Sequence, residues 1–320
     1  MQELASEQDF LDLIDRFFPE ESGTLLLGRG DDCAIVSCPD SVCISTDLFL
    51  EDVHFRRKYF EPGDIGYKSL AVNVSDIAAM AARPLCFTLG LMIPKGLDGQ
   101  FFSSFFRGMQ SLCKQLDLPL VGGDLSRSQS LGVTITIWGS SKTGNFLTRN
   151  GVRTGDLVFA VGPLGLARVG FQTLEKERNT EKYPQAIAHF LRPAIPVAES
   201  ILLGDTKIVH SLMDVSDGLA ADIPRLLGPR GLELTVSESD LHPEVRSFAR
   251  EEGGSAIRTA LLGGEDYALL GTVTEGNASV LLQQIPGALF LGRVTDDPGI
   301  RKNGELILVD GFDHFVGGDG

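Results

Sequence analysis

The chain has 320 residues, 43% of them hydrophobic and 22% charged, with a formal net charge of −15 at pH 7. This length allows two domains with complete cores, and the composition is that of an ordinary globular protein. The excess of negative charge argues against a nucleic-acid backbone or an anionic membrane surface as the main partner. Phosphate groups remain possible ligands, provided that metal ions lie between them and the acidic side chains.

The N-terminal stretch, residues 1–20, is acidic and carries apolar residues at helical spacing. It therefore predicts a helix and has the character of neither a signal peptide nor a transit peptide. No apolar run approaches the roughly 20 residues that span a bilayer. The five cysteines lack any C-x-x-C pairing, which favours a reducing compartment, so we expect a cytoplasmic protein.

Short β-like runs alternate with helical patterns through the first half of the chain. Strands are expected at residues 33–37, 41–46, 85–93, 119–123 and 131–139, and helices at residues 64–82 and 98–116. A turn-rich segment, residues 139–156, follows them. Its glycines and polar residues predict the join between two halves of the chain.

The second half again interleaves strand-like runs with helical patterns. Strands are expected at residues 157–162, 210–215, 232–236, 267–273 and 305–310. The glycine-rich stretch at residues 161–170 lacks the dinucleotide-binding spacing, so it predicts a tight strand-to-helix turn. The whole pattern predicts a mixed α/β protein with two domains, residues 1–145 and 146–320, joined near residues 140–155.

The stretch LMDVSDGLAADI, residues 212–223, places Asp214 and Asp217 around Ser216 where an apolar run becomes a helical pattern. Ser216 or Asp217 could cap a helix that begins near Gly218, and an acid there also suits the helix dipole. Capping leaves Asp214 without a role, although a buried carboxylate without a partner is costly. The stretch alone leaves open whether these acids cap a helix or bind a ligand.

Acids recur beside glycine or at strand ends along the chain, and Asp76 differs from the others. Its helix is apolar or small on nearly every side, so we expect a buried carboxylate that needs a metal or a salt bridge to Lys68 or Arg83. Carboxylates near glycines suit Mg²⁺, which usually keeps water and shares its coordination shell with substrate phosphates. The sequence has no P-loop, protein-kinase motif set or His/Cys zinc cluster. Any nucleoside triphosphate would therefore be bound through carboxylate-held metals.

Seven motifs taken in order resemble the thiamine-monophosphate kinase family, which belongs to the superfamily of aminoimidazole ribonucleotide synthase and selenophosphate synthetase. The motifs are GDDCAIV, STDLFLEDVHF, KSLAVNVSDIAAMAARP, LVGGD, LTRNGVRTGD, DVSDGLAADI and GGEDYALL. Each motif is weak alone, but the ordered set is specific and extends from about residue 10 to the final GFDHF. Departures include Val197, where relatives often have arginine, and Phe312, where tyrosine or tryptophan can occur.

The resemblance implies a two-domain aminoimidazole ribonucleotide synthase-like fold and a homodimer whose N-terminal sheets pair across the two-fold axis. It also implies ATP-dependent phosphorylation of thiamine monophosphate, assisted by several Mg²⁺ ions. The metal ligands that the motifs imply are Asp32, Ser45, Thr46, Asp47, Asp76, Asp124, Asp214 and Asp217. The implied ATP contacts are Gly123, Asp124, Arg149 and Ser216, and the residues implied to face the thiamine moiety are His54, Glu265 and Phe312.

Two alternatives share this fold. One is a ring-closing or selenophosphate-forming enzyme, and the other is a maturation factor that binds a partner protein. Selenophosphate synthetases carry a reactive cysteine or selenocysteine with a lysine near the N-terminus, and no such pair precedes residue 28. The Gly-Gly-Glu-Asp-Tyr motif, residues 263–267, also favours the kinase, while the maturation factors end in a functional cysteine that this sequence lacks.

Overall fold

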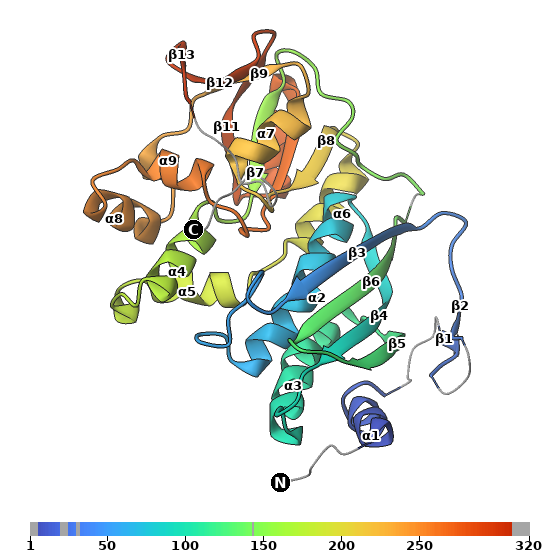
Figure 1. Cartoon of the computed structure of the whole chain (residues 1–320). Helices are drawn as coiled ribbons and strands as arrows, with labels where there is room; N and C mark the ends of the chain where they lie inside the picture. The colour runs from blue at the N-terminus through green and yellow to red at the C-terminus, as the bar shows by residue number, and fades with distance from the viewer. Residues whose placement is uncertain (1–5, 20–24, 30–32, 143, 309–320) are drawn as a thin grey trace. The chain divides into compact units, whose positions relative to one another are not determined.

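The computed structural model describes residues 6–19, 25–29, 33–142 and 144–308. The chain divides into two compact units, one of residues 1–77 and 82–144 and the other of residues 78–81 and 145–320. The first unit contains a four-stranded sheet and a small two-stranded one, and the second contains a seven-stranded sheet (Figure 1). The mixed α/β class predicted from the sequence is confirmed.

The four-stranded sheet of the first unit has the order β3-β6-β4-β5. Its strands are β3 (Cys43–Leu50), β4 (Arg83–Ile93), β5 (Leu120–Arg127) and β6 (Gly132–Ser140). Neighbouring strands are antiparallel except β4 and β5, which are parallel. A parallel pair needs a crossover connection, and α3 (Gly99–Leu116) supplies it.

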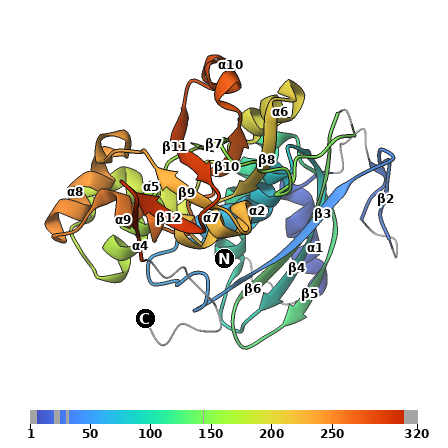
Figure 2. The same cartoon turned by 90° about the horizontal axis from the view of Figure 1, so that it is seen from above.

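Within the residues that the structure describes, the helices of the first unit cover one face of this sheet. Both α2 (Pro62–Ala79) and α3 lie along that face (Figures 1 and 2). Strand residues on the helix side, such as Phe87 and Ile137, are fully buried. On the opposite face, Ile44 and Leu48 of β3 are 59% and 53% exposed. The sheet therefore presents an apolar face that α2 and α3 leave open.

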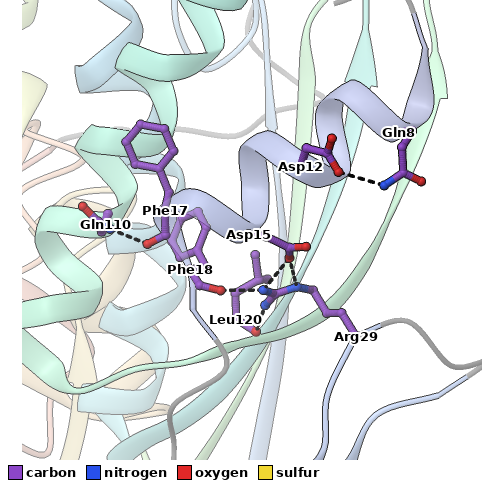
Figure 3. Close-up of polar contacts among 8 residues, drawn as sticks. All are labelled: Gln8, Asp12, Asp15, Phe17, Phe18, Arg29, Gln110 and Leu120. Atoms are coloured by element: carbon purple, nitrogen blue, oxygen red, sulfur yellow. Dashed lines mark hydrogen bonds and ion pairs between the residues drawn. The ribbon is translucent and has the colours of Figure 1, made fainter.

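Arg29 connects three segments of the first unit, as Figure 3 shows. It follows the small sheet strand β1 (Leu25–Leu27), which pairs with β2 (Ile35–Val36). Its guanidinium donates to the Asp15 carboxylate of α1 (Glu7–Phe17) at 2.9 and 3.2 Å, and to the Leu120 carbonyl of β5 at 2.6 Å. It also donates to the Phe18 carbonyl at the end of α1. These charge-assisted bonds join α1 to the start of β5.

The seven-stranded sheet of the second unit has the order β13-β12-β9-β11-β7-β10-β8. All neighbours are antiparallel except β12 and β9, which are parallel. The strands are β7 (Leu157–Val161), β8 (Val209–Asp214), β9 (Gly231–Leu234), β10 (Leu269–Val273), β11 (Ala288–Thr295), β12 (Gly299–Lys302) and β13 (Glu305–Leu306). Every residue of β10, which lies between β7 and β8, is buried, so both faces of the sheet are covered at this strand.

The helices of the second unit are α4 (Leu166–Glu175), α5 (Pro184–Leu191), α6 (Val197–Thr206), α7 (Leu219–Leu227), α8 (Pro243–Glu251), α9 (Ala256–Leu261) and α10 (Ala278–Gln284). One core joins residues of α4, α7, α8 and α9 to residues such as Val158 and Ala160 of β7. The predicted strand-to-helix turn is confirmed, because β7 ends at Val161 and α4 begins at Leu166. Within the described residues, no helix is both long and apolar enough to cross a membrane.

We expect Arg29→Met to lower the free energy of unfolding by about 2 kcal/mol, because it leaves two carbonyls and a carboxylate without their charged donor. The Arg29 side chain is only 15% exposed, so water replaces these bonds poorly. Chemical denaturation would measure the loss, and Arg107→Met on exposed α3 surface is the matched control. A loss as small as that of the control would contradict a structural role for Arg29.

Candidate functional site

Three of the expected metal ligands lie together in the first unit. Alternate residues of β3 face α2, and the Ser45 hydroxyl donates to the Asp76 carboxylate of that helix. One turn earlier in α2, the Asn73 side chain accepts a hydrogen bond from the Asp47 backbone N–H at 3.2 Å. Because side chains two residues apart in a strand share a face, Ser45, Asp47 and Asp76 form one group of oxygen donors.

Asp76 is half-buried, so the expectation of a buried carboxylate was wrong. The reason is its position against β3, which is an edge strand of the sheet and leaves one side of the carboxylate open. The sequence suggested Lys68 or Arg83 as a salt-bridge partner of Asp76. Arg83 lies 4.0 Å from the Asp117 carboxylate. The ammonium group of the buried Lys68 lies 5.4 Å from the Phe60 ring centre.

Thr46 and Asp124 lie on the opposite face of the same sheet. The Thr46 hydroxyl is hydrogen-bonded to the Thr136 hydroxyl of β6 at 2.8 Å. Asp124 is aligned with Gly90, and the row continues through β6 to Leu48 of β3. Three strand spacings separate Asp124 from β3, or about 14 Å. A single first unit therefore does not bring Asp124 to Ser45 and Asp47.

Gly123 allows the backbone of β5 to approach β4 closely. A Cβ atom at this position would lie 1.9 Å from the Leu89 carbonyl oxygen, so every other side chain would force the strands apart. Gly123 precedes the exposed Asp124. A ligand at this place could contact the backbone of Gly123 and the carboxylate of Asp124. Glycine at this place is typical of strands that a ligand approaches.

His54 belongs to a tightly bonded loop that follows β3. The Nδ1 atom of its ring accepts a hydrogen bond from the Leu50 backbone N–H at 3.1 Å. The backbone N–H of His54 donates to the Leu50 carbonyl at 2.8 Å. The ring stacks on Phe49 with 5.9 Å between centres. The Glu51 carboxylate accepts from the Leu131 N–H at 3.0 Å and holds the loop against β6. Because Nδ1 is an acceptor, the neutral ring carries its proton on Nε2.

In the second unit, the expected acids Asp214 and Asp217 lie where β8 ends and α7 begins. The predicted capping by Ser216 or Asp217 is wrong, because the N-cap of α7 is Gly218 at φ 98° and no side chain caps the helix there. The Asp217 carboxylate instead accepts from Arg225. The Asp217 N–H donates to the Asp222 carboxylate of α7 at 3.1 Å. The capping site needs a left-handed residue, which Gly218 supplies.

Asp222 and Arg225 were not identified as functional residues from the sequence. The Asp222 side chain is fully buried and 2.8 Å from the Arg225 guanidinium. Burial, and then the charges of Asp214 and Asp217, raise the pKa of Asp222 to about 6, although Arg225 opposes them. The only available signal was the i,i+3 spacing of an acid and an arginine after the DVSDG motif. These acids repel one another, so a further cation would be complementary.

Arg149 and Glu265 lie next to the same end of β8. The Thr148 carbonyl accepts from the Leu212 N–H of β8 at 2.9 Å, so the exposed Arg149 follows a segment paired with that strand. On the other side, the Glu265 N–H donates to the Ser216 carbonyl at 2.7 Å. The described part of the second unit thus brings together, at one strand end, Arg149, Asp214, Ser216, Asp217 and Glu265.

Family models match most of the chain. The model for the AIR synthase related protein, N-terminal domain, matches residues 30–141, and the model for the C-terminal domain matches residues 153–301. The chain is 34% identical over 322 residues to thiamine-monophosphate kinase of Escherichia coli (strain K12), which covers 95% of this chain and 97% of that protein. The chain belongs to the thiamine-monophosphate kinase family.

Solved structures agree with membership of the thiamine-monophosphate kinase family. The enzyme from Stenotrophomonas maltophilia K279a superimposes with a TM-score of 0.82 at 28% identity, covering 93% of this chain and 96% of that one. AaThiL complexed with AMPPCP and TMP superimposes with a TM-score of 0.78 at 29% identity, covering 97% of each chain. The resemblance and the two-domain fold expected from the motifs are therefore confirmed.

Two residues that the family motifs imply, Asp32 and Phe312, lie outside the described residues. Within residues 6–19, 25–29, 33–142 and 144–308, no group of three or more His, Cys, Asp or Glu side chains is arranged to hold a metal. A cation held by the described acids would thus need further ligands. Mg²⁺ generally has such further ligands, because it keeps several water molecules and also coordinates substrate phosphates.

Proposed function

We propose that this member of the thiamine-monophosphate kinase family transfers the γ-phosphoryl group of ATP to thiamine monophosphate and forms thiamine diphosphate, as the last step of its biosynthesis. The observation that carries the proposal is the 34% identity to a thiamine-monophosphate kinase over 95% of the chain. A relative solved with the ATP analogue AMPPCP and TMP supports the same substrates. The cysteine usage and charge support a cytoplasmic reaction, without nucleic acid or membrane as a partner.

An ADP-release assay with ATP, Mg²⁺ and a panel of phosphorylated acceptors tests this function. We expect a clear preference for thiamine monophosphate over the other phosphate monoesters. Phosphorus NMR of the product should show the new diphosphate. Equal rates with all acceptors, or ADP release that needs none of them, would overturn the proposal in favour of another ATP-dependent enzyme of the superfamily.

Several Mg²⁺ ions fit the donors that the two units present. In the first unit the donors are Ser45, Asp47 and Asp76, and in the second they are Asp214 and Asp217. All are hard oxygen donors. In the second unit, burial, and then the charges of Asp214 and Asp217, raise the pKa of the neighbouring Asp222. We propose Asp32, Thr46 and Asp124 as further metal ligands, because the family motifs imply them. When bound, the ions would offset repulsion between the two phosphate-bearing substrates.

The residues of the chain need not supply a general base. The acceptor is a phosphate monoester whose second ionisation lies near pH ~6, so its attacking oxygen is already mostly deprotonated at neutral pH. The difficulty is repulsion between two anions, which Arg149 can reduce at the triphosphate. Gly123 and Ser216 would bind ATP, and Glu265 and Phe312 would bind the thiamine moiety. Transfer can then proceed in line, directly from ATP to the acceptor, without a phosphoenzyme.

Activity should depend completely on Mg²⁺, and Asp47→Asn or Asp76→Asn should lower kcat by about two orders of magnitude or more. Each substitution removes a charge from the donor group beside Ser45 while keeping its shape. Turnover at saturating Mg²⁺ would be measured against Asp40→Asn, an exposed acid of the same unit. Near-normal turnover of both site variants would contradict the assignment of Asp47 and Asp76 as metal ligands.

His54→Asn should mainly raise the KM for thiamine monophosphate, because His54 positions the acceptor through a ring whose Nδ1 is bonded to the Leu50 N–H. At saturating acceptor, kcat should fall less than about tenfold, whereas loss of a true base costs about 10²–10⁴-fold. Initial rates with both substrates varied would separate the two effects. His242→Asn, at the N-cap of α8, is the control. A far larger fall in kcat, or a phosphorylated protein trapped with ATP alone, would contradict the mechanism.

We further propose that two copies pair through the open face of the four-stranded sheet. Ile44 and Leu48 are more than half exposed on this face, which α2 and α3 leave open. Thr46 and Asp124 share the face. A second copy would therefore cover two residues that the motifs assign to metal or ATP, so we expect these residues to act in the dimer.

Light scattering at micromolar concentration should show a stable dimer with an interface at or above the usual size of about 1,600 Å². The double variant Ile44→Lys, Leu48→Lys should be monomeric, because charges on a buried apolar face cannot be solvated. Val280→Lys, at a partly exposed position of the second unit, should remain dimeric. A monomeric unmodified protein would contradict the proposal, and so would a double variant that stays dimeric.

A further inference from the structure

Asp266 is a buried acid that the proposed reaction does not use. Its side chain is fully buried at the first turn of α4. One carboxylate oxygen accepts from the Ala167 N–H at 2.8 Å, and the other accepts from the Gly165 N–H. Burial raises the pKa of Asp266 to about 7, while these backbone donors oppose the rise. Asp266 thus ties the loop before β10 to the turn that opens α4.

The residues on either side of Asp266 have unusual backbone conformations. Glu265 has φ 63° and Tyr267 has φ 50°, both in the left-handed region. Residues with a Cβ atom rarely adopt it, and for a bulky side chain such as tyrosine it is an outlier that the surroundings must enforce. The loop would relax to an extended or right-handed conformation if nothing held it.

Hydrogen bonds of the loop backbone and of Asp266 hold these conformations, among them the bonds from Gly165 and Ala167 to the Asp266 carboxylate. Glu265 N–H donates to the Ser216 carbonyl at 2.7 Å, and Tyr267 N–H donates to the Val215 carbonyl at 2.9 Å. The Asp266 carbonyl lies 3.0 Å from Nε2 of the buried His189 in α5. Together with the Ala167 bond, they anchor the loop to β8, α4 and α5.

Close packing of two glycines strengthens this connection. A Cβ atom on Gly264 would lie 3.0 Å from the Ser216 carbonyl oxygen, and one on Gly263 would lie 2.9 Å from Gly165 Cα. The loop therefore lies against the DVSDG segment on one side and the α4 turn on the other. A shift of the α4 turn would move Glu265 relative to Ser216.

We propose that Asp266 is a positioning residue for acceptor binding, which acts by holding Glu265 in its left-handed conformation beside the DVSDG segment. This inference rests on the proposed function, in which Glu265 faces the thiamine moiety. His189 assists by binding the Asp266 carbonyl. An ordinary helix cap would only stabilise α4, whereas a positioning residue also sets the affinity for the acceptor.

A double-mutant cycle on the full-length protein tests this role. Asp266→Asn keeps the shape but places an amide among the backbone donors, and Glu265→Gln removes the charge that Asp266 is argued to position. We expect each to raise the KM for thiamine monophosphate about tenfold, with the KM for ATP changed less than about threefold. The double variant should then resemble Glu265→Gln alone, because both changes remove one interaction.

A purely structural role would give a different pattern. Thr173→Val is the matched control, because Thr173 is buried in α4 and its hydroxyl donates to the Val169 carbonyl at 2.7 Å. It should lower the Tm and leave both KM values unchanged. If Asp266→Asn fails to fold, His189→Leu replaces it in the cycle, since it removes the partner of the Asp266 carbonyl.

Each outcome bears on one proposal. Additive effects of the two substitutions, or an equal rise in KM with Thr173→Val, would overturn the role of Asp266. An unmodified protein that does not phosphorylate thiamine monophosphate would overturn the proposed function before any variant is compared. Turnover by the unmodified protein with an unchanged acceptor KM in Asp266→Asn or His189→Leu would overturn only the positioning role.

Discussion

Repulsion between carboxylates is the constraint on which the rest of this structure depends. The second unit keeps Asp222 fully buried near Asp214 and Asp217, with Arg225 as the cation that the structure sets against them. Burial of Asp222, and then the charges of Asp214 and Asp217, favour the neutral acid and raise its pKa. The fold tolerates this because its cores, α7 included, are otherwise apolar and closely packed. A further cation close to these carboxylates would be electrostatically favourable.

The two units hold their acidic side chains by different contacts. In the first, a helix and an edge strand exchange polar contacts, so that Asp76 and Asp47 are held by Ser45 and Asn73. In the second, Asp214 ends β8 and Asp217 follows it, and the backbone of the segment between them bonds to the neighbouring loop. The first arrangement leaves the donors half-exposed, whereas the second buries Asp214. The first relies on hydroxyl, amide and backbone groups, whereas in the second Arg225 also binds the Asp217 and Asp222 carboxylates.

Much of the fold was predictable, because the alternation of strand and helix patterns is a local property of the sequence. The faces of the sheet were not. Between Phe87 and Thr88, the pairing of β4 with β5 shifts by one residue. Without that shift, Asp124 would align with Leu91 and share the face of Asp47; with it, Asp124 shares the face of Thr46. No pattern within β5 reveals such a shift. The capping of α7 failed for a similar reason, since the left-handed Gly218 displaced the polar residues from the capping position.

Backbone hydrogen bonds connect the DVSDG segment to the Gly-Gly-Glu-Asp loop. The relative position of these two segments therefore does not depend on contacts between long side chains. The Val215 N–H donates to the Ala268 carbonyl at 2.8 Å, and the Glu265 and Tyr267 N–H groups donate back at 2.7 and 2.9 Å. Backbone bonds of this kind fix distances more firmly than side-chain contacts, because no rotamer freedom separates the groups. Fixed positions of this kind favour reactions in general, since small misplacements of the reacting groups reduce rates steeply. The strained conformations at Glu265 and Tyr267 are consistent with such fixed positions, because strain persists only where the surrounding structure enforces it.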